Sequence, residues 1–399
     1  MSQALIARQP IFDAHMRVYG YEVLFRASPE SEQAELTDGD QATSSVLIDL
    51  FTNMDVDHLL GGKWAFINAT AVTLQQLAAH PVAEHRMVVE VLEDVRVDDR
   101  VAEALLVLRQ AGVRVALDDF LWDTDHQSLA TLADFIKVDV QALSDAELER
   151  HARELAPFSA QLLAEKVETA EEWARCRELG FELFQGYFFA RPQTFSKRRL
   201  PTDRVQILRL VARLQDPEVD LEELAALVEK DASLSYRLLR LINSAYFPTR
   251  NRVDDIRRAT VYLGIEGLRT WVTWLALSRI DYKPTELKLI TLERAQMARR
   301  LASPFGVAPE SAFLVGLFST LDALMDRPMK QLLADLPLSE GVKAALIDRE
   351  GELGKLITAL FQYEQGEWSA LARAGCDVER MGQAYLEALE WAEGINYSL

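Results

Sequence analysis

The chain contains little cysteine, no long apolar run and no recognisable leader. Only two of its 399 residues are cysteines, Cys176 and Cys376, and they are too few and too far apart for a disulfide framework. No run reaches the ~18 apolar residues that a membrane span requires. The first twelve residues lack a signal-peptide pattern, because Arg8 interrupts their apolar stretch. These absences predict a cytoplasmic protein without a membrane span.

Positive charge and histidine are also scarce. The chain has 43 Lys and Arg residues against 62 Asp and Glu, for a formal net charge of −19. Nonspecific binding to duplex DNA depends on Lys and Arg that neutralise phosphates, so duplex nucleic acid is excluded as a partner. All six histidines lie at or before His151. A hydrolase that binds its metals through clustered histidines is therefore excluded from residues 152–399.

Short apolar segments that end in polar residues fill the first half of the chain. They predict eight strands, at residues 5–13, 18–26, 64–68, 87–93, 113–119, 135–140, 161–167 and 183–190. Helical stretches such as 42–52, 98–111 and 169–179 separate the later strands. A short joint through Ala14 and His15 connects the first two strands, so that pair must be antiparallel. Eight strands in ~190 residues favour a (β/α)8 barrel over a doubly wound sheet.

The second half predicts helices only. A polar stretch at 193–220 contains a linking helix at 205–214, and Asp220 and Glu223 form a capping box that opens the next helix. Further helices are predicted at 234–243, 256–263, 268–280, 292–301, 311–324 and 378–391. The fold class is therefore α/β plus all-α, with a barrel domain at residues 1–197 and a helical domain at 198–399.

Polar residues at the carboxyl ends of barrel strands converge on one site. In this chain the predicted strands end in carboxylates, an Asn and a Lys. Carboxylates so close together need a cation, and a divalent metal suits them.

An ordered series of motifs resembles a known family. Tyr21-Glu22-Val23-Leu24-Phe25-Arg26 resembles the signature of EAL domains, which hydrolyse cyclic di-GMP. Over roughly residues 5–195 the other motifs of that family are Gln9-Pro10-Ile11, Phe66-Ile67-Asn68, Glu90-Val91-Leu92-Glu93, Asp118-Asp119-Phe120, Ile136-Lys137-Val138-Asp139, Ala164-Glu165-Lys166-Val167-Glu168-Thr169 and Gln185-Gly186-Tyr187.

The resemblance implies a role for each matching residue. The metal ligands would be Glu22, Asn68, Glu90, Asp118 and Asp119. Lys137 would orient the attacking water, and Glu165 would be a metal ligand or general base. The residues that contact the ligand would be Gln9, Arg26 and Gln185, while Glu93 would anchor the next active-site loop. An oxygen-only ligand set suits a two-metal site with Mg²⁺ or Mn²⁺. For Lys137 alone, a salt bridge to Asp139 or a neighbour is the alternative.

One loop departs from the family pattern. EAL domains usually follow the Asp-Asp-Phe motif with a Gly-Thr-Gly-Tyr-Ser-Ser type loop, which couples metal binding to the dimer interface. Here residues 121–128 read Leu-Trp-Asp-Thr-Asp-His-Gln-Ser, so Leu121 and Asp123 replace both glycines. The support of the metal site is therefore altered, and whether the site turns over is left open. The same loop is the reason to consider a homodimer.

Residues 200–390 resemble HDOD domains, which are metal-free relatives of HD-type phosphohydrolases. The likeness lies in 228–234, 238–245 and 259–267, which includes Leu263-Gly264-Ile265. Because this half has no histidine, the resemblance implies a regulatory or partner-binding module for an unknown protein. Two hypotheses follow for the whole chain. One is a cyclic di-GMP phosphodiesterase regulated by its helices. The other is a weak or inactive EAL domain that senses cyclic di-GMP or acts as a scaffold.

Overall fold

The structure is a computed structural model of the chain. It describes residues 5–26, 60–79, 86–92, 95, 98–118, 130–186, 202–216, 218–244, 247, 252–280, 283–334 and 336–398. The predicted helix at 42–52 and the loop at 121–128 lie outside the described residues.

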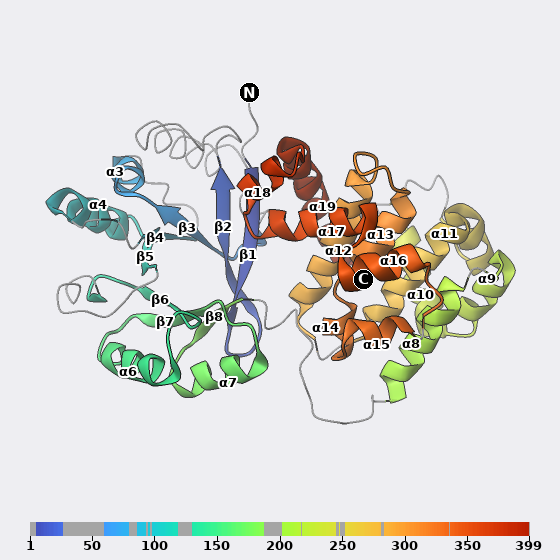
Figure 1. Ribbon diagram of the computed structural model, residues 1–399, viewed down its shortest axis with the longest axis horizontal. Coiled ribbons are helices and arrows are strands. Elements are labelled where there is room, and N and C mark those ends of the chain that lie inside the picture. Colours follow the sequence, from blue (N-terminus) through green and yellow to red (C-terminus); the bar gives the residue numbers. More distant parts are fainter. Residues whose placement is uncertain are drawn as a thin grey trace. The chain divides into compact units, whose positions relative to one another are not determined.

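Eight strands form a closed barrel, which confirms the predicted architecture (Figure 1). They are β1 (Leu5–Asp13), β2 (Val18–Arg26), β3 (Trp64–Ala69), β4 (Met87–Val91), β5 (Arg114–Leu117), β6 (Phe135–Asp139), β7 (Gln161–Glu165) and β8 (Leu183–Gln185). β1 pairs antiparallel with both β2 and β8, and the other neighbours pair parallel. The barrel closes because β1 contributes hydrogen bonds to both of its neighbours.

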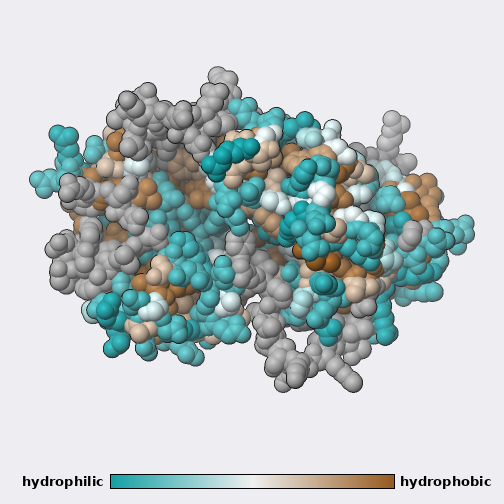
Figure 2. All heavy atoms as spheres, viewed as in Figure 1, coloured by the Kyte–Doolittle hydropathy of each residue, from teal (hydrophilic) through white to brown (hydrophobic). Residues whose placement is uncertain are grey.

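Amphipathic helices follow the parallel strands. They are α3 (Ala71–Ala79), α4 (Asp99–Gln110), α6 (Asp145–Leu155) and α7 (Ala170–Glu178). Thr169 caps α7 in a reciprocal capping box with Glu172, and the helix ends before Gly180, whose φ is 95°. Hydrophilic residues predominate over α6 and α7 in the view of Figure 2, as expected for helices with one solvent-facing side.

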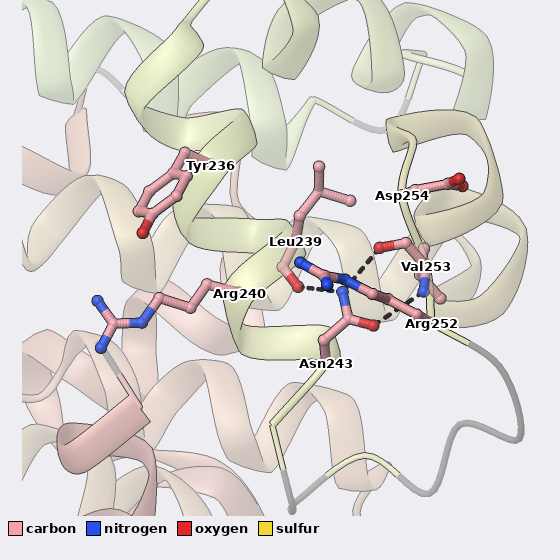
Figure 3. Close-up of a pocket in the computed structure, with 7 residues that line it drawn as sticks. All are labelled: Tyr236, Leu239, Arg240, Asn243, Arg252, Val253 and Asp254. Atoms are coloured by element: carbon pink, nitrogen blue, oxygen red, sulfur yellow. Dashed lines mark hydrogen bonds between the residues drawn. The ribbon is translucent and has the colours of Figure 1, made fainter.

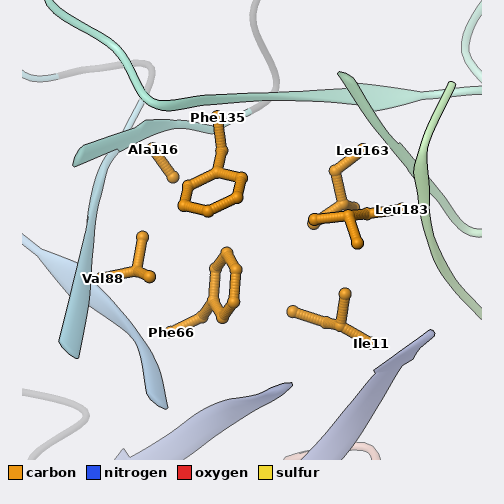
Figure 4. Close-up of a cluster of buried hydrophobic side chains, with 7 residues drawn as sticks. All are labelled: Ile11, Phe66, Val88, Ala116, Phe135, Leu163 and Leu183. Atoms are coloured by element: carbon orange, nitrogen blue, oxygen red, sulfur yellow. The ribbon is translucent and has the colours of Figure 1, made fainter. Parts of the chain in front are cut away.

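A layer of apolar side chains fills the barrel interior (Figure 4). Its buried members come from seven strands and are Ile11, Phe66, Val88, Ala116, Phe135, Leu163 and Leu183. β2 contributes Gly20 at this level, since a Cβ there would lie 2.6 Å from the Trp64 carbonyl oxygen. Side chains alternate along a strand, so the next inward-facing residue of each strand lies two positions away. The apolar layer therefore supports a second layer nearer the strand ends.

The helical half contains only helices among its described residues. They are α8 (Thr202–Gln215), α9 (Leu221–Glu229), α10 (Ala232–Ile242), α11 (Ile256–Leu277), α12 (Thr285–Leu301), α13 (Pro309–Phe318), α14 (Leu321–Met325), α15 (Met329–Ala334), α16 (Glu340–Asp348), α17 (Gly351–Glu364), α18 (Trp368–Arg373) and α19 (Val378–Ser398). None of the described helices is long and apolar enough to cross a membrane.

One feature of the helical half confirms a predicted helix boundary, and another corrects one. The helices expected at 256–263 and 268–280 both lie in α11 and are separated there by a break at Gly264, which has φ 67°. The single helix expected at 311–324 is divided into α13 and α14. Ser319 ends α13 with its hydroxyl donating to the Gly316 carbonyl, and the Thr320 hydroxyl hydrogen-bonds that of Thr291 at 2.6 Å. These side-chain contacts interrupt an otherwise helical sequence.

The chain forms two compact units. The first comprises Met1–Phe189 together with Gln362–Gly382, and the second comprises Ala190–Phe361 together with Gln383–Leu399. A division into folding domains after residue 197 stays a prediction. The return of residues 362–382 to the barrel unit is a feature that the local sequence does not indicate.

Candidate functional site

A ring of polar side chains lies next to the apolar layer of the barrel. Each member is two positions from a core residue or from Gly20 on the same strand, and they are Gln9, Glu22, Asn68, Glu90, Asp118, Lys137, Glu165 and Gln185. Strand pairing brings neighbours into register, with Gln9 opposite Glu22 and Asn68 opposite Glu90. The two-residue period of the strands thus places the predicted residues on one inner surface.

Lys137 lies at the centre of this ring and is 1% exposed. Its Nζ atom is 2.8 Å from Glu165 Oε1, 2.8 Å from Asp118 Oδ1 and 2.9 Å from Glu90 Oε2. Glu22 Oε2 is more distant, at 3.9 Å. Carboxylates from β2, β4, β7 and the end of β5 therefore surround one ammonium group on β6.

The electrostatics of the ring shift three pKa values. Burial would lower the pKa of Lys137, but the four surrounding carboxylates outweigh it and raise the pKa well above its ordinary value. Burial raises the pKa of Glu90 well above its ordinary value, although Lys137 opposes the rise. Burial also raises the pKa of Glu165 to about 7, again against the effect of Lys137. Glu165 can therefore exchange a proton near neutral pH.

Glu22 is held by amide side chains on two other strands. Asn68 Nδ2 donates to Glu22 Oε1 at 3.1 Å, and Gln185 Nε2 donates to Glu22 Oε2 at 2.6 Å. Gln185 Nε2 also donates to Gln9 Oε1 at 3.2 Å. Both carboxylate oxygens of Glu22 are thus oriented by hydrogen bonds from β3 and β8, and Gln9 supports this arrangement from β1.

The donor chemistry of the ring fits a divalent cation. Four carboxylates face a single ammonium group, so three formal negative charges remain unbalanced within this cluster. Among its buried oxygens, Asn68 Oδ1 and Glu90 Oε1 accept no hydrogen bond, while Glu90 Oε2 is paired with Lys137. Oxygen donors of this kind suit Mg²⁺ or Mn²⁺.

The described residues do not complete a metal site by themselves. Within the described ranges, no three Asp, Glu, His or Cys side chains are arranged to hold an ion. Asp119, the residue expected to bridge two ions, lies outside those ranges. The observed cluster is therefore a set of metal-compatible oxygens gathered around Lys137.

The other predicted site residues are placed as follows. Arg26 is the last residue of β2 and its side chain is not among those described, and Glu93 lies outside the described residues. The alternative for Lys137 is a salt bridge to Asp139 or a neighbour: Asp139 is not the partner, whereas neighbouring carboxylates of the ring are. Asp139 pairs with Lys166 and accepts hydrogen bonds from the backbone of Gln141 and Ala142.

Sequence reasoning missed a contribution from the C-terminal part of the chain. Gln9 Nε2 donates to the backbone carbonyl of Glu364 at 3.3 Å, across 355 positions of sequence. A backbone carbonyl has no side-chain signature, so no motif could have indicated this contact.

The helical unit has a pocket of its own, with a volume of ≈ 930 Å³ (Figure 3). It is lined by Tyr236, Leu239, Arg240, Asn243, Arg252, Val253 and Asp254. The Asn243 side chain accepts from the Val253 backbone N–H and donates to the carbonyls of Val253 and Leu239. This amide joins the end of α10 to the segment before α11 and so forms one wall of the pocket.

Comparisons with known proteins agree with both halves of the chain. The family model for the EAL domain matches residues 41–192, and that for the HDOD domain matches residues 200–336. The cyclic di-GMP phosphodiesterase CdgJ of Vibrio cholerae is 35% identical over 405 residues, which cover 99% of this chain and 94% of that protein. The uncharacterized protein YuxH of Bacillus subtilis is 30% identical and covers 98% of this chain and 99% of its own length.

Solved structures also show similarity to part of the chain. A complex of Klebsiella pneumoniae BlrP1 with calcium and cyclic di-GMP is 26% identical to this chain. The alignment covers 48% of this chain and 56% of that one, with a TM-score of 0.39.

Proposed function

This chain belongs to the family of proteins that join an EAL domain to an HDOD domain, and on that basis we propose that it hydrolyses cyclic di-GMP to a linear dinucleotide. The observation that carries the proposal is the ring of carboxylates around Lys137 at one inner surface of the barrel. CdgJ, a cyclic di-GMP phosphodiesterase, is similar to this chain over nearly its whole length.

The metal-binding role falls to the oxygen-rich part of the ring. Glu22, Asn68, Glu90 and Asp118 would hold Mg²⁺ or Mn²⁺, with Asp119 as the further ligand that the resemblance implies. When bound, the divalent ions neutralise charge on the phosphodiester and lower the pKa of a water molecule. The unbalanced negative charge of the ring and the unsatisfied Glu90 Oε1 and Asn68 Oδ1 atoms support this assignment.

The remaining ring residues act on protons and orientation. Glu165, whose pKa is about 7, would accept the proton of the attacking water near neutral pH. Lys137 stays protonated because the surrounding carboxylates raise its pKa, so it would orient Glu165 and the water without giving up its proton. Gln9, Gln185 and Arg26 would contact the nucleotide.

The helical unit would regulate the barrel or bind a protein partner. It holds none of the six histidines of the chain, which excludes the histidine-ligated metal chemistry of HD-type hydrolases. Domains at residues 1–197 and 198–399 are part of the same proposal.

Hydrolysis is tested with the purified 399-residue chain, cyclic di-GMP and Mn²⁺ or Mg²⁺, with the products separated by chromatography. We expect a linear dinucleotide that requires the added metal. The Glu165→Gln variant should lower turnover by ~10²-fold or more, because it removes a positioned base with little change in shape. Glu182→Gln is the matched control, since Glu182 is exposed and precedes β8 at the opposite end of the barrel. Full activity in Glu165→Gln would contradict the role of Glu165.

A second candidate is a cyclic di-GMP sensor without turnover. The replacement of both loop glycines by Leu121 and Asp123 favours it, because bulkier and less flexible residues follow the metal-binding Asp pair. Calorimetric binding of cyclic di-GMP with no linear product at any metal concentration would select this candidate.

A further inference from the structure

The barrel unit includes a segment from the far end of the chain. Residues 362–382 hold the last turn of α17, all of α18 and the start of α19, and they form one compact unit with residues 1–189. Small residues allow a close approach to the first two strands. A Cβ on Gly382 would lie 3.2 Å from a Leu5 methyl group, and one on Gly366 would lie 3.0 Å from a Leu24 methyl group.

A buried tyrosine attaches this segment to β1. The Tyr363 hydroxyl donates to the carbonyl of Ile6 at 2.9 Å, across 357 positions of sequence. Tyr363 is 0% exposed, and its ring packs edge-to-face against Trp368 with the ring centres 6.3 Å apart. A buried hydrogen bond of this kind holds the end of α17 at a defined position along β1.

The next residue is linked to the candidate metal site by a series of hydrogen bonds. The Glu364 carbonyl accepts from Gln9 Nε2, and Gln9 Oε1 accepts from Gln185 Nε2. Gln185 Nε2 also donates to Glu22 Oε2 at 2.6 Å. Three successive hydrogen bonds therefore join the backbone of α17 to a carboxylate of the ring.

Both ends of this series fix the direction of its bonds. The Glu22 carboxylate only accepts, so Gln185 presents its NH₂ group, and that group also donates to the Gln9 oxygen. The Glu364 carbonyl also only accepts, so it takes the NH₂ group of the Gln9 amide. Without the Glu364 carbonyl, this NH₂ group would lose its acceptor and the Gln9 amide would be fixed at one end only, by Gln185.

We propose that Gln9 is a positioning residue for Glu22, and that the Glu364 carbonyl sets its orientation, so that the last turn of α17 controls the affinity of the barrel for a divalent cation. This inference rests on the proposed function, because it takes Glu22 to be a metal ligand. α17 is a single helix whose residues 351–361 belong to the helical unit. One covalent path from the helical unit to the metal site therefore runs through Tyr363 and Glu364.

The test is Mn²⁺ binding by calorimetry on the metal-free 399-residue chain. Substituting a residue that directly supports a metal ligand costs about 10–100-fold in affinity. Gln9 acts through Gln185, so Gln9→Leu should weaken Mn²⁺ binding by about 3–10-fold. Tyr363→Phe should act in the same direction, because it frees the last turn of α17 from β1. Tyr236→Phe, on an exposed face of α10, is the matched control and should bind as the wild type does.

Hydrogen exchange separates positioning from a general loss of structure. In Gln9→Leu the amides of β1 should keep wild-type protection while Mn²⁺ affinity falls. An affinity within twofold of wild type in Gln9→Leu overturns the inference, as does a fall that occurs only with loss of β1 protection. Wild-type Mn²⁺ binding without hydrolysis overturns only the proposed hydrolysis, whereas no Mn²⁺ binding at all overturns both.

Discussion

Lys137→Met is the substitution whose effect the structure defines best. Methionine keeps most of the side-chain length but removes the charge, so the surrounding carboxylates lose the ammonium group that lies 2.8 Å from Asp118 and Glu165 and 2.9 Å from Glu90. Removing one partner of a buried ion pair costs ~3–5 kcal/mol, because the remaining charge is buried without compensation. We expect that loss in the free energy of unfolding of the metal-free barrel at pH 8.

The loss should shrink as the pH falls. Burial raises the pKa of Glu165 to about 7 and that of Glu90 well above its ordinary value even with Lys137 present. Carboxyl groups of the unfolded chain release their protons near pH ~4.5. Between pH ~4.5 and about 7 the native state therefore binds more protons than the unfolded state. The free energy of unfolding consequently decreases as the pH rises through this window and increases again as the pH is lowered. Lys137→Met should follow this dependence more steeply than the wild type, since its buried carboxylates have no cation nearby.

The measurement is urea unfolding followed by pulsed hydrogen exchange on peptides from β6 and β7. These peptides report the free energy of unfolding of the barrel separately from that of the helical unit. Lys166→Met is the matched control, because the Lys166 side chain is 58% exposed and pairs with Asp139 near the surface. A surface pair of this kind contributes at most ~1 kcal/mol. The reasoning is refuted if Lys137→Met is as stable as Lys166→Met at pH 8, or if its deficit is the same at pH 5.5 as at pH 8.

Two further predictions concern the backbone and the thiols of the barrel unit. Gly186 has φ 140°, and a Cβ there would lie 2.1 Å from the Val167 carbonyl oxygen. Gly186→Ala should therefore lower the free energy of unfolding of the barrel by ~1–3 kcal/mol, measured by the same exchange assay. Gly180→Ala is its control, because that position has φ 95° but open space around it, and an equal loss in both variants would show that the clash is unimportant. Cys376 should react with a thiol reagent in the native protein at pH 8 well before Cys176, which is 1% exposed and whose pKa burial raises to about 11. Equal labelling rates would contradict the burial of Cys176.

Much of the barrel and its site followed from local sequence. The predicted strands agree with β1–β7 to within two residues, because each is a short apolar segment between polar turns. The strand predicted at 183–190 begins as expected but ends at Gln185, and residues 187–190 lie outside the described ranges. The two-residue period of a strand places Phe66 in the core and Asn68 in the site. In the same way it places Phe135 in the core and Lys137 in the site. A local repeat thus determined which side chains share one inner surface of the barrel.

The helical half was predicted less completely. The break at Gly264 agrees with the separate helices predicted on either side of it. Helical periodicity continues through Thr320, yet a hydroxyl contact with Thr291 of α12 lies where the predicted helix is divided. Propensity describes a residue in isolation, whereas this second break depends on a neighbour that the fold brings close.

Only the tertiary structure decided how the site residues interact. The sequence allowed a salt bridge from Lys137 to Asp139 or a neighbour, and the structure shows which: Lys137 contacts carboxylates from four strands, because barrel closure brings all of them to one point. The contact between Gln9 and the Glu364 carbonyl spans 355 positions and uses a backbone atom, which every residue possesses. The sequence determined the chemical groups of the site and the strands that carry them. The tertiary structure determined which groups contact one another, because the distance between remote segments cannot be read from the residues that neighbour each of them in the sequence.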